Sequence, residues 1–190
     1  MKHAFLLAVP ALAFAAPLAA SEYDAALKQI ADERLAPIAA EPFVIEAVRQ
    51  MNSERAGVSQ ADIDGQDQAW RAQVGQSSAP LIDEVMGTPA SAQLAEIRDG
   101  GQGLFTEIFV MDNKGLNVAA SDITSDFWQG DEAKWQETYQ VGAGSVHISE
   151  IEFDESTQTF QAQVSLTVAD PDNAAPIGAI TFGVNVEMLE

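Results

Sequence analysis

Apolar residues in the first half of the chain recur at intervals of three and four, the spacing that places them on one side of a helix. The stripe runs from about residue 22 to residue 98, and its first members are Tyr23, Ala26, Leu27, Ile30, Leu35, Ile38, Phe43, Val44, Val48 and Met51. A break is expected between Pro37 and Pro42, because proline fits the first turn of a new helix. Further helices are predicted around residues 60–74, 81–86 and 90–97. Ser59 is the expected N-cap of the first of these, and Thr88 caps the last or Pro89 occupies its first turn.

After the glycine-rich residues 100–103 the apolar period changes to two, which is typical of strands. The predicted strands are residues 104–111, 116–120, 145–153, 160–168 and 176–188, the last with Ile180, Phe182, Val184, Val186 and Met188 on one face. Residues 112–115 form a hairpin turn, and residues 121–144 form an excursion with a helix at 131–140. Because helices and strands are segregated, we predict one α+β domain, with a long helical region (21–103) packed on a five-stranded antiparallel sheet (104–190).

The N-terminus is typical of a secretory signal. Met1-Lys2-His3 is a short basic start, residues 4–18 are apolar, and Ala19-Ala20-Ser21 are small. The apolar run is shorter than a bilayer span and contains Pro10 and Pro17, so we expect cleavage after Ala20 rather than a membrane anchor. The expected product is an exported, periplasmic or secreted protein whose mature chain does not insert into a membrane.

Composition removes several functional classes. There are 29 acidic and 9 basic residues, for a net charge of −20, which repels nucleic acid and anionic membranes. The absence of cysteine excludes disulfides, thiolate catalysis and Cys-ligated metals. With His147 as the single histidine after residue 20, no nucleophilic triad stands out, so we expect no enzyme and no cofactor.

Two acidic stretches suggest a metal site. Residues 62–67 alternate carboxylates and glycine like a calcium loop, but Gln73 stands where an EF-hand needs a bidentate glutamate. Asp170 and Asp172 are more typical of a turn. We therefore predict no metal site, and adventitious Ca²⁺ or Mg²⁺ binding at most.

Residues 106–118 and 121–135, with the string Trp128-Gln129-Gly130-Asp131-Glu132, resemble the extracellular sensor domains called PDC or Cache; residues 153–157 and 176–180 match further. The resemblance implies a PAS-like five-stranded sheet behind a long N-terminal helix, with a small molecule bound between the sheet and the excursion. Most such domains lie between two membrane helices of a receptor. This chain resembles the stand-alone exported form, so the resemblance implies action through a separate membrane-bound receptor or kinase.

The excursion is rich in aromatic residues, and Asp131, Trp135 and Tyr139 are four residues apart, which places them on nearly one face of a helix. Apolar walls with a few fixed polar groups are what a small-ligand pocket requires. Lys134 is a rare cation suited to a ligand carboxylate. The expected ligand-binding residues are Ser121, Thr124, Asp126, Trp128, Lys134, Trp135, Tyr139 and His147. The alternative is that Trp128 and Trp135 are core residues, that Lys134 pairs with Asp131 or Glu137, and that His147 is an ordinary strand residue.

Two functions remain open from the sequence. The first is a sensor for a small polar metabolite, a carboxylate or an amino acid. The second is an exported interaction module without a ligand, which forms a homodimer through its N-terminal helix.

Overall fold

The N-terminal helices follow the predicted apolar stripe. The computed structural model describes residues 17–155 and 157–189, so the predicted signal segment lies mostly outside the described residues, and cleavage after Ala20 stays a prediction. Helix α1 (Pro17–Ile30) continues through a π-helical turn η1 (Ala31–Leu35) into α2 (Ala36–Ala39). The π turn precedes Pro37, which has no N–H for an ordinary helical hydrogen bond; the Ala36 N–H instead reaches back to the carbonyl of Ala31.

The predicted break is confirmed just before Pro42, which begins α3 (Pro42–Glu54). Three further helices are α4 (Gln60–Gln73), α5 (Pro80–Met86) and α6 (Pro89–Gly100). The Ser59 hydroxyl accepts from the Asp62 N–H and the Asp62 carboxylate accepts from the Ser59 N–H, which completes a capping box. Thr88 caps α6 through the Ser91 N–H. In this half of the chain, local sequence signals therefore correctly locate the helix starts.

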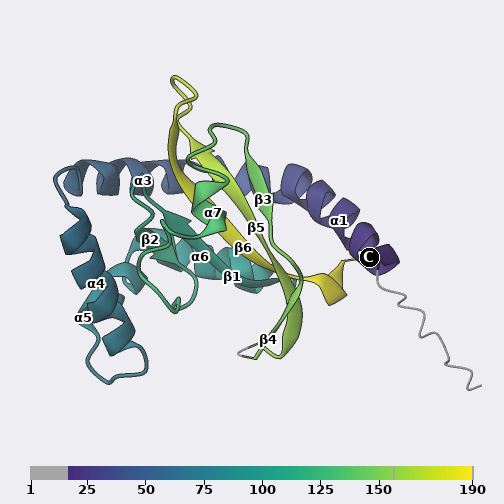
Figure 1. Ribbon diagram of the computed structural model, residues 1–190, viewed down its shortest axis with the longest axis horizontal. Coiled ribbons are helices and arrows are strands. Elements are labelled where there is room, and N and C mark those ends of the chain that lie inside the picture. The colour runs from purple at the N-terminus through teal and green to yellow at the C-terminus, as the bar shows by residue number, and fades with distance from the viewer. Residues whose placement is uncertain (1–16, 156, 190) are drawn as a thin grey trace, which may run out of the picture.

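The sheet is antiparallel throughout. Its strands are β1 (Phe105–Met111), β2 (Asn117–Ala120), β3 (Val146–Ile148), β4 (Glu152–Asp154), β5 (Thr159–Ala169) and β6 (Pro176–Asn185). The order is β2-β1-β6-β5-β3, and β4 also pairs with β5. This architecture, a helical N-terminal region followed by an antiparallel sheet, is the predicted α+β class and agrees with the PAS-like order that the resemblance implies (Figure 1).

The sheet has six strands because the predicted strand 145–153 is split into β3 and β4. Ser149 explains the interruption: its N–H donates to the Gln163 carbonyl at 2.9 Å, and its hydroxyl accepts from the Gln163 N–H at 2.9 Å. A side-chain oxygen thus takes the place of the next ladder carbonyl, and the regular pairing stops. It resumes where Glu152 faces Gln161.

The two faces of the sheet bury different sets of residues. Ile108, Ile180 and Phe182 point toward the N-terminal helices and form the main core with Leu27, Leu35 and Val48. Phe109, Met111 and Ala179 occupy the opposite face, where they pack with Trp135. In Figure 1 the N-terminal helices run behind the sheet and the excursion with α7 (Ala133–Gln136) lies in front of it. We call this front side the excursion face.

Two predicted element ends are wrong. The helix expected at 131–140 is only α7, because the Thr138 hydroxyl donates to the Lys134 carbonyl at 2.6 Å and the chain then turns. The last strand ends at Asn185, whose side chain accepts from the Glu187 N–H and starts the 3₁₀ turn η2 (Val186–Met188). Met188 is therefore 49% exposed and does not continue the apolar face. Within residues 17–155 and 157–189, no helix has both the length and the apolar character needed to span a bilayer.

Candidate functional site

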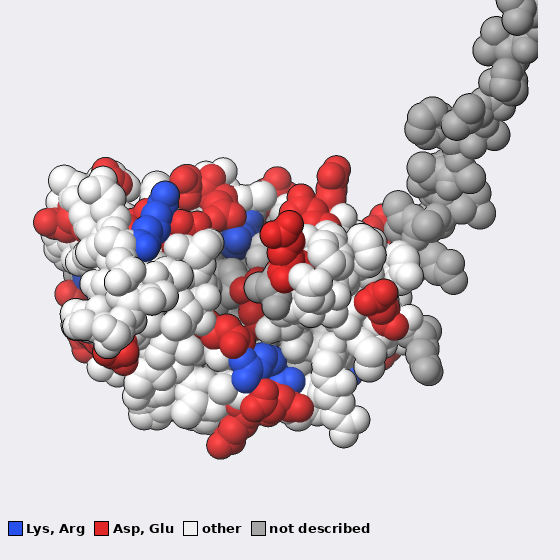
Figure 2. Space-filling view, turned by 90° about the horizontal axis from the view of Figure 1, so that it is seen from below, with Lys and Arg blue, Asp and Glu red and all other residues white. Residues whose placement is uncertain are grey.

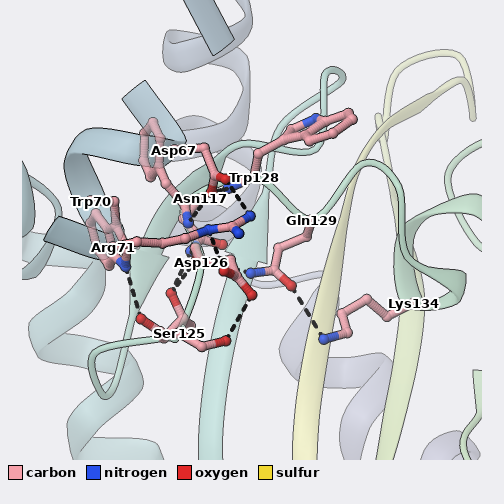
Figure 3. A network of polar contacts seen from close by, with 11 residues as sticks. Asp67, Trp70, Arg71, Asn117, Ser125, Asp126, Trp128, Gln129 and Lys134 are labelled. Atoms are coloured by element: carbon pink, nitrogen blue, oxygen red, sulfur yellow. Dashed lines mark hydrogen bonds and ion pairs between the residues drawn. The ribbon is translucent and has the colours of Figure 1, made fainter. Parts of the chain in front are cut away.

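The first half of the excursion is fixed to α4 through a buried carboxylate. Asp67 is 5% exposed, and its Oδ1 accepts from the backbone N–H groups of Phe127 at 3.0 Å and Trp128 at 3.1 Å. Arg71, one turn further along α4, pairs with Asp67 and reaches Asp126 at 2.8 Å (Figure 3). The predicted ligand residue Asp126 thus already has a cationic partner, and the loop is attached to the helix by charge-assisted bonds.

The polar groups of Thr124 and Trp128 form hydrogen bonds with neighbouring parts of the chain. The Thr124 hydroxyl accepts from Asn117 Nδ2 at 2.7 Å and donates to the Asp126 carbonyl at 2.7 Å. Trp128 Nε1 donates to the Lys114 carbonyl at 2.8 Å, and its ring packs against the cluster that contains Trp70. In this state both side chains stabilise the excursion.

Trp135 and Tyr139 lie against the excursion face of the sheet. Trp135 is 8% exposed, and its Nε1 donates to the backbone carbonyl of Asp112 at 3.0 Å. The Tyr139 ring stacks on Trp135 with a centroid separation of 4.9 Å. Burial, followed by the negative charge of Asp112, raises the pKa of Tyr139. The two aromatic side chains therefore pack directly on the sheet, and their role as walls of a ligand pocket stays a prediction.

Lys134 points toward the sheet rather than into solvent. Its side chain is 13% exposed, and Nζ lies 2.9 Å from Glu132, 3.2 Å from Gln129 and 5.5 Å above the Phe109 ring. The partner is therefore Glu132, not Asp131 or Glu137 as the alternative interpretation expected. The carboxylate of Glu137 instead lies 2.9 Å from Nδ1 of His147.

His147 stands at the far side of the same face. It lies opposite Ser165 on β5, and the Ser165 and Thr181 hydroxyls form a buried hydrogen bond of 2.9 Å. His147, Lys134 and Trp135 therefore belong to one face of the molecule. Ser121 lies at the edge of that face and is buried, with its hydroxyl accepting from the Ile108 N–H at 2.8 Å.

A cavity of about 610 Å³ opens beside Ser121. It is lined by Met86, Thr106, Glu107, Ser121, Asp122, Ile123, Asp154 and Thr157. Met86 also packs against the cluster of Phe109 and Trp135, so the cavity adjoins the excursion face. Figure 2 views the molecule from below, where acidic side chains predominate over basic ones. Of the predicted site residues, Ser121 alone lines this cavity.

Glu107 is an acidic residue of the cavity lining and is not among the predicted site residues. Its Oε1 accepts from Gln163 Nε2 at 2.9 Å. Burial raises the pKa of Glu107, while the Gln163 hydrogen bond and the positive charge of Lys134 act in the opposite direction. The available signal was the alternation within residues 104–111, which puts Glu107 on the same face as Phe109 and Met111.

Asp122 is a further acidic residue of the cavity lining, and it has a cationic partner. Arg98 at the end of α6 pairs with it and with Asp99 at 2.8 Å. Asp154 and Glu107 also lie in the lining. Repulsion by the negative charge of Asp154 contributes to the raised pKa of Glu107. The lining is thus net acidic and favours positively charged groups.

The acidic stretches that suggested calcium have other partners. Asp62 caps α4 and Asp67 holds the excursion, so their carboxylates serve different purposes. In the β5–β6 turn, Arg49 lies 2.6 Å from both Asp170 and Asp172. Among the residues that the structure describes, no group of three or more acidic or histidine side chains is arranged to hold a metal ion.

Comparison with known proteins gives only structural similarity, since no family model and no curated protein matches the chain. The chain is similar to the sensor domain of the Vibrio cholerae histidine kinase DctB, with 13% identity, a TM-score of 0.38, and coverage of 91% of this chain and 58% of that one. It is also similar to the sensory domain of the Campylobacter jejuni chemoreceptor Tlp3 with isoleucine bound (14% identity, TM-score 0.41, 93% and 66% coverage). A third similar structure is the ligand-binding domain of the Pseudomonas aeruginosa amino acid chemoreceptor PctC in complex with GABA. It has 13% identity and a TM-score of 0.37, and the match covers 75% of this chain and 58% of that one.

Proposed function

We propose that the protein is a small-molecule sensor module of the PDC/Cache type, and that its ligand is an amino acid. The observation that carries this proposal is the acidic cavity beside the excursion face, with Glu107 in its lining and Lys134 on the same face. The proposed site combines this cavity with the predicted residues Lys134, Trp135, Tyr139 and His147. Signalling through a separate membrane-bound receptor or kinase is part of the proposal.

The charges argue for an amino acid over a simple carboxylate. An ammonium group is attracted by Glu107 and Asp122, whereas a dicarboxylate is repelled by them. A carboxylate at the other end of the ligand could replace Glu132 as the partner of Lys134, whose Nζ is now 2.9 Å from that side chain. A zwitterion therefore matches the two ends of the proposed site better than either charge alone.

A thermal-shift screen tests the proposal with three sets of compounds: amino acids, simple amines and simple carboxylates. A ligand at 100 times its Kd stabilises the folded state by about 2.7 kcal/mol, so a specific ligand is readily detected. We expect the largest rise in melting temperature from an amino acid and none from dicarboxylates. Glu107→Gln should remove the rise, and the exposed Glu96→Gln variant is the matched control.

The second candidate is an interaction module that binds no small molecule and dimerises through α1. The observation in its favour is that Trp128 and Trp135 both donate their indole N–H to backbone carbonyls within the chain, as packed core residues do. If no compound shifts the melting temperature while sedimentation shows a dimer that substitutions on α1 dissociate, this candidate replaces the sensor.

A further inference from the structure

Phe153 and Phe160 form an uncovered aromatic pair at the end of the β4–β5 hairpin. They lie directly opposite each other, their ring centroids are 5.2 Å apart, and they are 49% and 48% exposed. On β5, Phe160 lies on the same face as Ala162 and Val164, both of which are fully buried. The pair therefore extends the helix-facing side of the sheet beyond the part that the helices cover, and its burial by a partner would be favourable.

The strand that carries Phe153 is also an open edge. Within the described residues, β4 pairs with β5 and with no other strand. In Figure 1 the β4–β5 hairpin projects from the lower end of the sheet, away from α1 to α3. An edge strand of this kind offers backbone N–H and C=O groups to an added strand.

The charge around the pair selects the type of partner. Glu150, Glu152 and Glu155 are exposed, and in the described part of the chain none of them pairs with Lys or Arg. A second copy of this chain would bring the same carboxylates together and be repelled. A segment with basic side chains would be attracted.

We propose that Phe153, Phe160 and the open edge of β4 form a docking surface for an extended segment of a different protein, in which apolar and basic side chains alternate. The apolar side chains cover the two rings, and the basic ones pair with the surrounding glutamates. The same hairpin contributes Asp154 and Thr157 to the lining of the acidic cavity, but the proposed docking surface uses the exposed rings and the edge of β4 rather than that lining.

The test is calorimetric titration with a capped peptide of alternating valine and lysine, and with a matched peptide of alternating valine and glutamate. We expect the lysine peptide to bind and the glutamate peptide not to bind. The double variant Phe153→Ser/Phe160→Ser should weaken lysine-peptide binding at least tenfold at unchanged net charge. The control is Val74→Ser/Val141→Ser, which removes two other exposed apolar side chains and should leave the affinity unchanged.

A second variant keeps the test independent of the phenylalanines. Glu152→Lys/Glu155→Lys should reverse the preference between the two peptides. The proposal is overturned if the lysine peptide does not bind, or if it binds both double variants as tightly as the parent, since attraction to the net charge alone would then explain binding. It is also overturned if sedimentation shows a dimer of the parent that Phe153→Ser/Phe160→Ser dissociates, because a second copy would then be the occupant.

Discussion

Arg55 donates from Nη1 to the carboxylate of Asp112 at 2.7 Å, and the Asp112 side chain is completely buried. The same aspartate accepts from the backbone N–H of Lys114 and Leu116 through its other oxygen. Its backbone carbonyl accepts from Trp135. One residue in the β1–β2 turn therefore connects the end of α3 to the excursion.

Loss of Arg55 should be strongly destabilising. Arg55→Met leaves the Asp112 carboxylate buried without a cation, and breaking such a pair costs about 3–5 kcal/mol. Urea denaturation followed by circular dichroism measures the change. Arg49→Met is the control, because the Arg49 side chain is 40% exposed and water weakens its pairs with Asp170 and Asp172, so its loss should cost much less stability. Equal losses in the two variants would contradict the buried pair.

Asp67 should be essential for holding the excursion on α4. Asp67→Ala removes the acceptor of the Phe127 and Trp128 N–H groups, and each unsatisfied buried donor costs about 1–3 kcal/mol. The free energy of unfolding should fall by that order, and tryptophan fluorescence should report the change around Trp128. Asp64→Ala, an exposed carboxylate on the same helix, is the control. The interpretation fails if Asp64→Ala is as destabilising.

Stability should depend on pH through Glu107. Burial raises the pKa of Glu107 above the ordinary value of about 4.5, so the folded state binds this proton more tightly than the unfolded state does. Above pH 4.5 the unfolded chain ionises first, and the contribution of this residue to stability decreases until the pH passes the folded-state pKa. Urea unfolding between pH 4 and pH 8 measures it. Glu107→Gln should gain stability relative to the parent as the pH rises; a constant difference would show that the folded-state pKa is not raised.

Lys134 should contribute more to ligand affinity than to stability. If the amino acid carboxylate binds Nζ, Lys134→Met should lower affinity by about tenfold or more, equivalent to about 1.4 kcal/mol, in a titration with the best amino acid from the screen. Lys28→Met on α1 provides the control with the same charge change. Unchanged affinity in Lys134→Met would mean that Lys134 only packs on Phe109 and pairs with Glu132.

Much of the fold could be predicted because its signals are local. The Ser59 N-cap, Pro42 at a helix start and the turn at residues 112–115 each depend on residues within a few positions of one another. Two errors in the predicted elements have local causes that the hydrophobic period does not show. The Ser149 hydroxyl interrupts the edge strand, and the Thr138 hydroxyl ends α7.

The candidate site could be predicted only in part. The aromatic excursion was recognised, and the structure places Lys134, Trp135, Tyr139 and His147 on one face of the molecule. The cavity lining was missed apart from Ser121, because Glu107 and Asp122 come from elements whose packing fixes their proximity.

By itself the sequence determined the helical half, the antiparallel sheet and the acidic surface. Periods of 3.6 and 2 depend on residues close together in the chain, and net charge depends on composition alone. The tertiary structure alone decided which charges meet. Arg55 and Asp112 are 57 positions apart, and Asp67 and Phe127 are 60 apart. Such pairs form because burial removes water and makes each charge or N–H find a partner, and which partner is near is set by how α3 and α4 pack against the sheet and its excursion.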